Sequence, residues 1–127
     1  MANDSTTTQQ LGQKGEELAV TFLRGQGYRI LEKNYRIKIG EIDIIARDRD
    51  TICFVEVKSR NSPARGIPQE AVTSFKRRKM TQVAWWYLKD KNSEGKKARF
   101  DVVAIVYDPL TPPQLQLFKN AFDVEYR

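Results

Sequence analysis

The chain has 127 residues, a length that suits one domain and leaves no room for two. It has no histidine and a single cysteine, which excludes Ser–His and Cys–His nucleophiles, histidine-containing zinc sites and an internal disulfide. Its 22 Lys and Arg outnumber its 16 Asp and Glu, and the net charge of +6 favours an anionic partner such as nucleic acid. A basic protein that is merely soluble would show the same balance.

The first ten residues are polar and lack the apolar segment of a secretory signal. We therefore expect a flexible N-terminal tail over residues 1–10 and a single domain over residues 11–127. No stretch approaches the length of a membrane span, so a cytoplasmic protein without membrane contact is expected. Apolar residues then recur at helical spacing from Leu11 to Leu23, and Gly25 and Gly27 end the pattern, which predicts an amphipathic helix.

Strand-like segments follow this helix. Residues 28–31 predict a short strand, and residues 32–40 an irregular segment. Two β-rich runs, 41–47 and 52–58, flank the polar turn 48–51, so a hairpin is predicted there. Cys53 lies inside the second run and is expected to be a buried structural thiol.

The second half of the chain predicts a helix between strands. Residues 59–70 contain prolines and a glycine and indicate a loop, after which Thr73 or Ser74 could cap a helix that ends near Lys89. The apolar stripe expected on this helix consists of Phe75, Met80, Val83, Ala84, Tyr87 and Leu88. A basic loop over 89–99, a central strand over 100–107, an edge strand over 115–118 and a short terminal helix complete the prediction. The order indicates an α/β domain with a mixed central sheet flanked by helices.

The predicted hairpin carries the candidate catalytic and metal-binding residues. Strict alternation places Glu41, Asp43 and Ile45 on one face of the first strand, with Ile42, Ile44 and Ala46 on the other. The second strand has Phe54, Glu56 and Lys58 on one face. A connection of two or four residues would bring Asp43 opposite Glu56, with Cβ atoms about 5 Å apart, whereas three residues would separate them.

Two facing carboxylates repel each other, and a hard cation such as Mg²⁺ removes that conflict. Lys58 could then activate water or stabilise charge on a phosphate, as metal-assisted phosphodiester hydrolysis requires. Alternatively, Glu56 and Lys58 form a plain ion pair on a solvated strand, and Asp43 is ordinary surface polarity.

Both predicted helices offer further charged groups. Glu16 flanks the apolar stripe of the first helix, so it is the acid expected to point inward, unless it only complements the helix dipole. Lys76 lies four residues before Met80, on the inner side of the second helix, where it could reach the acids or a phosphate. Trp85 and Trp86 could stack on bases, although a position in or beside the core is the favoured interpretation.

Six segments in this order resemble the bacterial YraN family: GEELAVTFL, GYRILEKNYR, GEIDIIARD, FVEVKSR, AVTSFKRRK and RFDVVAI. That family is similar to archaeal Holliday junction resolvases and to restriction-endonuclease-like nucleases with the PD-(D/E)xK signature. The resemblance implies a restriction-endonuclease-like fold in which Asp43 and Glu56, with the Val57 carbonyl, bind Mg²⁺ or Mn²⁺. It also implies that Lys58 is the catalytic lysine and that Glu16 and Lys76 belong to the site; Ile42 stands where the signature has proline.

The expected function is therefore a metal-dependent endonuclease that acts on DNA, including branched or repair intermediates. The residues expected to bind nucleic acid are basic: Arg36, Arg60, Lys76, Arg77 and Lys79. A homodimer is expected by analogy with resolvases, which act on two strands symmetrically. The alternatives are a non-catalytic nucleic-acid-binding module of the same fold and an interaction or scaffold protein with purely structural ion pairs.

Overall fold

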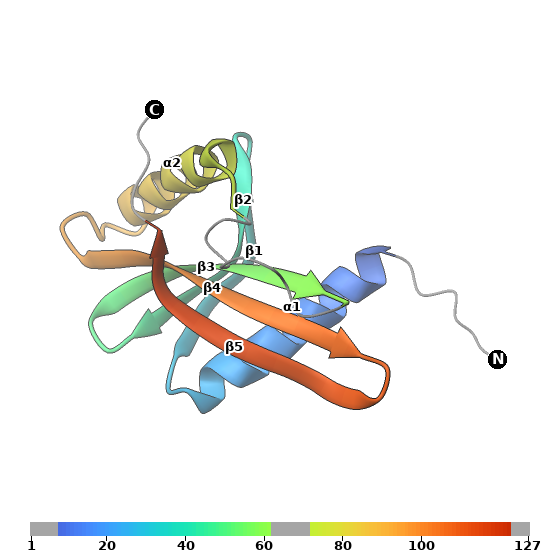
Figure 1. The fold of residues 1–127 in the computed structure, drawn as a ribbon. Coiled ribbons are helices and arrows are strands. Elements are labelled where there is room, and N and C mark those ends of the chain that lie inside the picture. The colour runs from blue at the N-terminus through green and yellow to red at the C-terminus, as the bar shows by residue number, and fades with distance from the viewer. Residues whose placement is uncertain (1–7, 62–71, 123–127) are drawn as a thin grey trace.

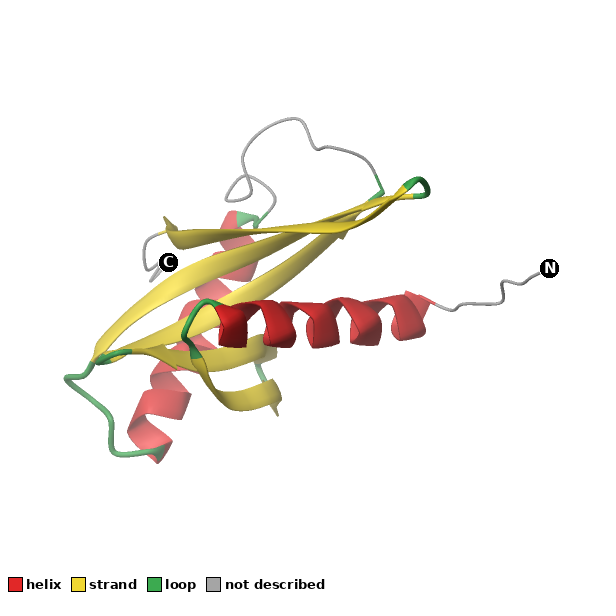
Figure 2. Ribbon diagram, turned by 90° about the horizontal axis from the view of Figure 1, so that it is seen from below, coloured by secondary structure: helices red, strands yellow, loops and turns green. Residues whose placement is uncertain are grey.

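The computed structural model describes residues 8–61 and 72–122, and over these residues it shows one mixed sheet with a helix on each face (Figures 1 and 2). The helices are α1 (Thr8–Gly25) and α2 (Ser74–Asp90). The strands are β1 (Arg29–Ile37), β2 (Gly40–Asp48), β3 (Thr51–Arg60), β4 (Lys97–Asp108) and β5 (Thr111–Phe122). The α/β class predicted from the sequence is confirmed.

The strands lie in the order β1-β2-β3-β4-β5, and the only parallel pair among these described strands is β3–β4. Hairpin turns can join antiparallel strands, but two parallel strands need a crossover, and α2 lies within it. The predicted succession of a three-stranded meander, a helix and a further strand is therefore observed.

Each face of the sheet has its own apolar core. On one face, α2 contributes Met80, Val83 and Tyr87 to a cluster that includes Ile45 and Phe54. On the other face, α1 contributes Ala19, Val20 and Leu23 to a cluster that includes Val55 and the buried thiol of Cys53. Side chains alternate between the two faces along a strand, and both faces of the central strands are covered. Successive residues of β3 are therefore buried, which explains its continuous apolar run.

Several predicted boundaries were wrong near the N-terminal half. Helix α1 begins at Thr8, three residues inside the predicted tail. Strand β1 continues to Ile37, through most of the segment predicted to be irregular. Its polar composition hid it, because β1 is an edge strand and about half of its side chains are exposed. The β1–β2 connection is consequently a two-residue turn between Ile37 and Gly40.

The C-terminal half also differs in detail. The Thr73 hydroxyl caps α2 by accepting a hydrogen bond from the Lys76 amide at 3.2 Å, as predicted. Phe75 is 63% exposed and does not join the core, because it lies five residues before Met80, well round the helix from the buried side. Strand β5 runs to Phe122 where a terminal helix was expected to begin. The predicted loop beyond residue 61 and the rest of that terminal helix lie outside the described residues.

Neither helix in the described ranges is both long and apolar enough to cross a membrane.

Candidate active site

The β2–β3 hairpin has the register that brings the two candidate acids together. Asp48 pairs with Thr51 around a turn of two residues, two fewer than the predicted connection but with the same parity. The ladder then runs back to the pair Ile44–Val55 and stops there, one position before Asp43 and Glu56. The acids therefore lie at the point where the two strands separate, which we call the β2–β3 fork.

The fork coincides with a break in the alternation of β2. Ile44 faces the core under α1, whereas Ile42 packs in the core under α2, so the prediction that they share a face was wrong. On the neighbouring strand β1, Asn34 lies opposite Asp43, between the pairs Lys33–Ile44 and Tyr35–Ile42, and has a left-handed φ of 52°. Asparagine tolerates this conformation, and this residue lies opposite the point at which β2 separates from β3.

Asp43 uses the fork to contact β3 directly. Its Oδ2 accepts a hydrogen bond from the Val57 backbone amide at 2.8 Å. This amide has lost its strand partner, so the carboxylate satisfies a backbone donor that would otherwise be unpaired. The contact holds Asp43 beside Glu56, close enough for the charge of Asp43 to raise the pKa of Glu56.

Glu56 is a buried acid whose hydrogen-bonding capacity is only partly used. It is 5% exposed, and its Oε2 lies 3.9 Å from Lys58 Nζ and 3.7 Å from Lys76 Nζ. Its Oε1 is buried and has no hydrogen-bond partner among the described residues. Burial, followed by the charge of Asp43, raises the pKa of Glu56 to about 7. Burial also raises the pKa of Asp43, against the opposing effects of the Val57 amide and Lys76.

Glu16 approaches the fork from α1. Burial and then the charge of Asp43 raise its pKa, while a hydrogen bond with Asn34 acts in the opposite direction. Asn34 is a site residue that sequence reasoning missed, and its only signal was an asparagine at a point where a strand could break. No group of three or more His, Cys, Asp and Glu side chains within the described ranges is arranged to hold a metal ion. Asp43 and Glu56 lie beside each other at the fork as a pair of carboxylates.

This two-carboxylate arrangement fits Mg²⁺ or Mn²⁺. Mg²⁺ keeps several waters and is commonly held by one or two carboxylates together with phosphate oxygens of a substrate. The unpartnered Oε1 of Glu56 and the repulsion between the two acids are both features that a divalent cation would relieve.

The basic residues expected to bind nucleic acid are spread over the molecule. Lys76 lies at the fork. Lys79 lies over the Phe75 ring at 5.4 Å on the outside of α2, and Arg77 Nε donates to the Val72 carbonyl at 2.8 Å while its guanidinium lies over the Phe122 ring. Arg36 is paired with Glu41 at 3.4 Å across the β1–β2 hairpin, and Arg60 ends β3.

Sequence comparisons place the whole of this arrangement within one family. The model of Uncharacterised protein family UPF0102 matches residues 15–105, which include both helix-borne and strand-borne residues of the fork. The chain belongs to the UPF0102 family. This is the YraN family that the sequence segments resembled.

Relatives cover almost the full chain. A UPF0102 protein of Geotalea daltonii is 49% identical over 98% of this chain and 95% of its own length. A UPF0102 protein of Desulfosudis oleivorans is 47% identical over 91% of each chain, and one of Chlorobium phaeobacteroides is 49% identical over 88% of this chain and 93% of its own. The UPF0102 assignment therefore applies to the domain as a whole.

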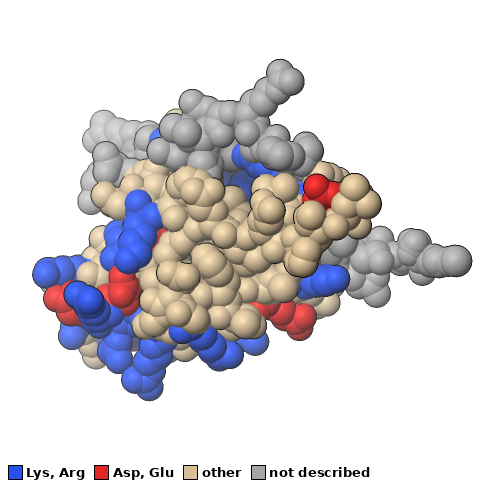
Figure 3. Space-filling view, turned by 60° about the horizontal axis from the view of Figure 1, so that its bottom comes forward, with Lys and Arg blue, Asp and Glu red and all other residues tan. Residues whose placement is uncertain are grey.

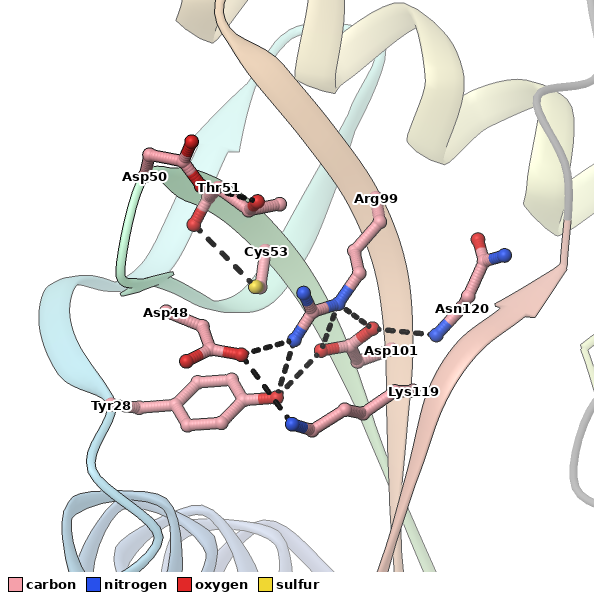
Figure 4. Close-up of polar contacts among 9 residues, drawn as sticks. All are labelled: Tyr28, Asp48, Asp50, Thr51, Cys53, Arg99, Asp101, Lys119 and Asn120. Carbon is pink, nitrogen blue, oxygen red and sulfur yellow. Dashed lines mark hydrogen bonds and ion pairs between the residues drawn. The ribbon is translucent and has the colours of Figure 1, made fainter.

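A second buried charge cluster of this UPF0102 protein lies on the α1 side of the sheet and was not predicted (Figure 4). Asp101 is 0% exposed and accepts hydrogen bonds from the Tyr28 hydroxyl at 3.1 Å, Arg99 Nε at 3.0 Å and the Asn120 amide at 2.9 Å. Arg99 also donates to Tyr28 at 2.7 Å and to Asp48 at 2.9 Å. We call these residues the Asp101 network. It ties together β4, β5, the end of β2 and the segment before β1.

Charge on the surface is mixed. Figure 3 shows Lys and Arg gathered toward one end of the visible face, with Asp and Glu among them and a broad neutral stretch beside them. This end contains the β2–β3 turn and the start of β4, where Lys97 pairs with Asp50 at 3.2 Å. The net charge of +6 is therefore not a uniform basic patch on this face.

Proposed function

We propose that this protein is a metal-dependent nuclease of the restriction-endonuclease-like type, which hydrolyses phosphodiester bonds in DNA at the β2–β3 fork. The observation that carries the proposal is the buried Glu56 carboxylate, whose Oε1 lacks a partner among the described residues while a second acid, Asp43, lies beside it. Native proteins satisfy most buried polar atoms, so an unsatisfied carboxylate oxygen beside a like charge is expected where a ligand completes the site.

In this proposal Asp43 and Glu56, with the Val57 carbonyl, hold Mg²⁺ or Mn²⁺. When bound, the cation supplies charge stabilisation for the phosphodiester and makes water a better nucleophile at neutral pH. No covalent intermediate with the protein is needed.

The chain's own residues have separate tasks. Lys58 and Lys76 are partly exposed and approach Glu56 from β3 and α2, so their ammonium groups can contact a phosphate that reaches the fork. The Asp43–Val57 hydrogen bond fixes the carboxylate relative to β3. Glu16, whose pKa is raised by burial and by Asp43, can hold a proton at the edge of the site.

Other parts of the proposal follow from the substrate. A DNA substrate suits a cytoplasmic protein. Branched DNA or repair intermediates would suit a homodimer, which can act on two strands. The net charge of +6 also supports a second candidate, a nucleic-acid-binding module of the same fold without efficient catalysis. Salt-sensitive binding that is indifferent to metal and to loss of the acids would favour that module.

The test is cleavage of labelled linear, flapped and four-way DNA by the full chain with Mg²⁺ or Mn²⁺. Glu56→Gln and Asp43→Asn should each reduce cleavage by at least about 100-fold, because each removes a charge needed in the transition state. Glu17→Gln and Asp50→Asn are matched controls, since both acids are outside the fork.

Binding of Mn²⁺, measured by calorimetry without DNA, should be lost in the fork variants and retained in the controls. Cleavage that persists unchanged in Asp43→Asn or Glu56→Gln would show that the fork is not the active site. Absence of both cleavage and metal binding in the wild type would refute the proposal.

A further inference from the structure

The outer face of α2 carries aromatic rings that the core does not use. Phe75, Trp85 and Trp86 are 63%, 51% and 48% exposed, respectively. Large aromatic side chains are usually buried, and a group of exposed rings commonly marks a surface that contacts another molecule. We call this group, together with Lys79 and Lys89, the α2 outer face.

The cations of the α2 outer face lie over these rings. Lys89 Nζ is 4.8 Å from the centre of the Trp85 ring and 5.7 Å from that of Trp86, and Lys79 Nζ is 5.4 Å from the Phe75 ring. The helical sequence from residue 74 to residue 89 contains five Lys and Arg and no Asp or Glu: Lys76, Arg77, Arg78, Lys79 and Lys89. The face therefore combines flat apolar rings with the ammonium groups of Lys79 and Lys89. Asp90, the only acid of α2, is its last residue and pairs with Lys91 at 3.9 Å.

The face is also continuous with the fork. Lys76, one residue after Phe75, contacts Glu56 at 3.7 Å, so the start of α2 lies at the candidate active site. From Phe75 to Lys89 the helix extends about 20 Å away from it, at about 1.5 Å per residue. Both tryptophans also line an apolar hollow of about 570 Å³ between α2 and the sheet, which Phe100, Phe122 and Arg99 border from the other side.

We propose that the α2 outer face binds an unpaired strand of nucleic acid, with phosphates on Lys79 and Lys89 and a base stacked on Trp85 or Trp86. Every base has a flat face that an aromatic ring can stack on, but bases inside a duplex are already stacked. The two indole rings are perpendicular, at 85°, with centres 5.3 Å apart. A base stacked on one ring therefore meets the edge of the other, which suits a single unstacked base better than a continuous stack.

A second copy of the chain is a poorer occupant. In a twofold dimer the same patch lies on both sides of the interface, so Lys79 and Lys89 would face the same cations of the other copy. The only acid of α2, Asp90, pairs with Lys91 at 3.9 Å. Phosphates would neutralise these cations, so charge complementarity favours nucleic acid.

The inference rests on the proposed function for its substrate, since it makes a DNA with an unpaired segment the preferred ligand. It can be tested by binding alone. Trp85 and Trp86 are the only tryptophans in the chain, so the intrinsic tryptophan fluorescence of the protein reports on this face. Titration with a single-stranded oligonucleotide, at low salt with EDTA, should quench it, and a blunt duplex of the same length should quench it much less.

Variants then locate the contact. Trp85→Leu combined with Trp86→Leu should weaken binding of a fluorescent single-stranded oligonucleotide, measured by anisotropy, by at least about fivefold, because base–ring stacking is lost. Replacement of both tryptophans by Phe keeps aromatic rings and should restore most of the affinity. Lys89→Ala should weaken binding and reduce its salt dependence, whereas Lys97→Ala, which removes the same charge at the start of β4, should change affinity by less than about twofold.

Three results would overturn the inference. Equal binding of single strands and duplexes would remove the preference for unpaired bases. Unchanged affinity in the folded double Leu variant, with circular dichroism as the check, would remove the stacking role. A dimer that dissociates in the Leu variant while DNA binding is unchanged would assign the face to a second copy. Because these assays need no metal and can be repeated in Glu56→Gln, their outcome is independent of whether the fork cleaves DNA.

Discussion

Glu56 and Asp101 are buried acids on the neighbouring parallel strands β3 and β4, and their surroundings differ sharply. Asp101 pairs with Val55 and Glu56 with Val102, so adjacent positions send the two carboxylates to opposite faces of the sheet. Asp101 accepts hydrogen bonds from Tyr28, Arg99 and the Asn120 amide. Glu56 has two ammonium groups at 3.7–3.9 Å from one oxygen and no partner for the other among the described residues.

The two surroundings suit different roles, one in the fold and one in the proposed site. A buried acid that serves the fold is stable only when its hydrogen bonds and its charge are both satisfied, as in the Asp101 network. The fork instead places a second acid beside Glu56 and leaves an oxygen unpaired, an arrangement that opposes folding. Such a local conflict is expected at sites whose missing partner is a ligand.

The largest expected effect on stability comes from replacing Asp101, the satisfied acid. Asp101→Asn keeps the size of the side chain but removes the charge that Arg99 neutralises. Arg99 keeps Asp48 at 2.9 Å but loses its fully buried anionic partner, so the free energy of unfolding should fall by about 3 kcal/mol at neutral pH. Urea denaturation followed by circular dichroism measures it. A loss below about 1 kcal/mol would show that the network is not a major contributor to the fold.

Replacing Glu56, the unsatisfied acid, should raise the free energy of unfolding at high pH rather than lower it. In the unfolded chain Glu56 ionises near its ordinary pKa of 4.5. In the folded chain its pKa is raised to about 7, so it stays protonated to higher pH. Between these values the unfolded state releases a proton that the folded state retains, so the contribution of Glu56 to stability falls as pH rises. It is fully present below about pH 4.5 and lost by about pH 7.

Glu56→Gln removes this dependence. At pH 8 in EDTA the variant should be more stable than the wild type by about 2–3 kcal/mol, and the difference should vanish near pH 4.5. Glu17→Gln, on the exposed side of α1, controls for loss of one negative charge and should show no such difference. Saturating Mn²⁺ should narrow the gap at pH 8 by stabilising only the wild type. A less stable Glu56→Gln at pH 8 would mean that Lys58 and Lys76 already compensate the charge.

Most of the fold was predictable from hydrophobic patterning. The continuous apolar run of β3, the helical stripe of α1 and the Thr73 cap of α2 each depend on local sequence. Strand β1 beyond Leu31 and the extension of β5 were missed because edge strands bury few side chains and carry polar residues. The prediction that Phe75 belongs to the core was wrong, because its spacing from the other apolar residues of the stripe does not match the helical period.

The site was predictable in composition and not in geometry. The parity of the hairpin turn was enough to bring Asp43 near Glu56, and helical spacing pointed Lys76 inward. The separation of β2 from β3 coincides with a left-handed residue on a third strand, Asn34, and with the placement of Ile42 and Ile44 in two different cores. Neither factor is a property of the local sequence, so the Asp43–Val57 contact could not be foreseen.

The smallest expected effect tests how the satisfied acid is held. Arg99 donates to Asp101, Tyr28 and Asp48 at once, and the two carboxylates raise its pKa against burial. Arg99→Lys keeps the positive charge but replaces a planar group with several donors by one compact ammonium, which cannot reach all three partners. The free energy of unfolding should fall by about 1–2 kcal/mol, less than in Asp101→Asn, because charge neutralisation survives and only hydrogen bonds are lost. Denaturation of Arg99→Lys and Asp101→Asn under the same conditions separates the contribution of the hydrogen bonds from that of the charge. Equal losses of unfolding free energy would mean that the geometry of the guanidinium, rather than its charge, keeps Asp101 buried.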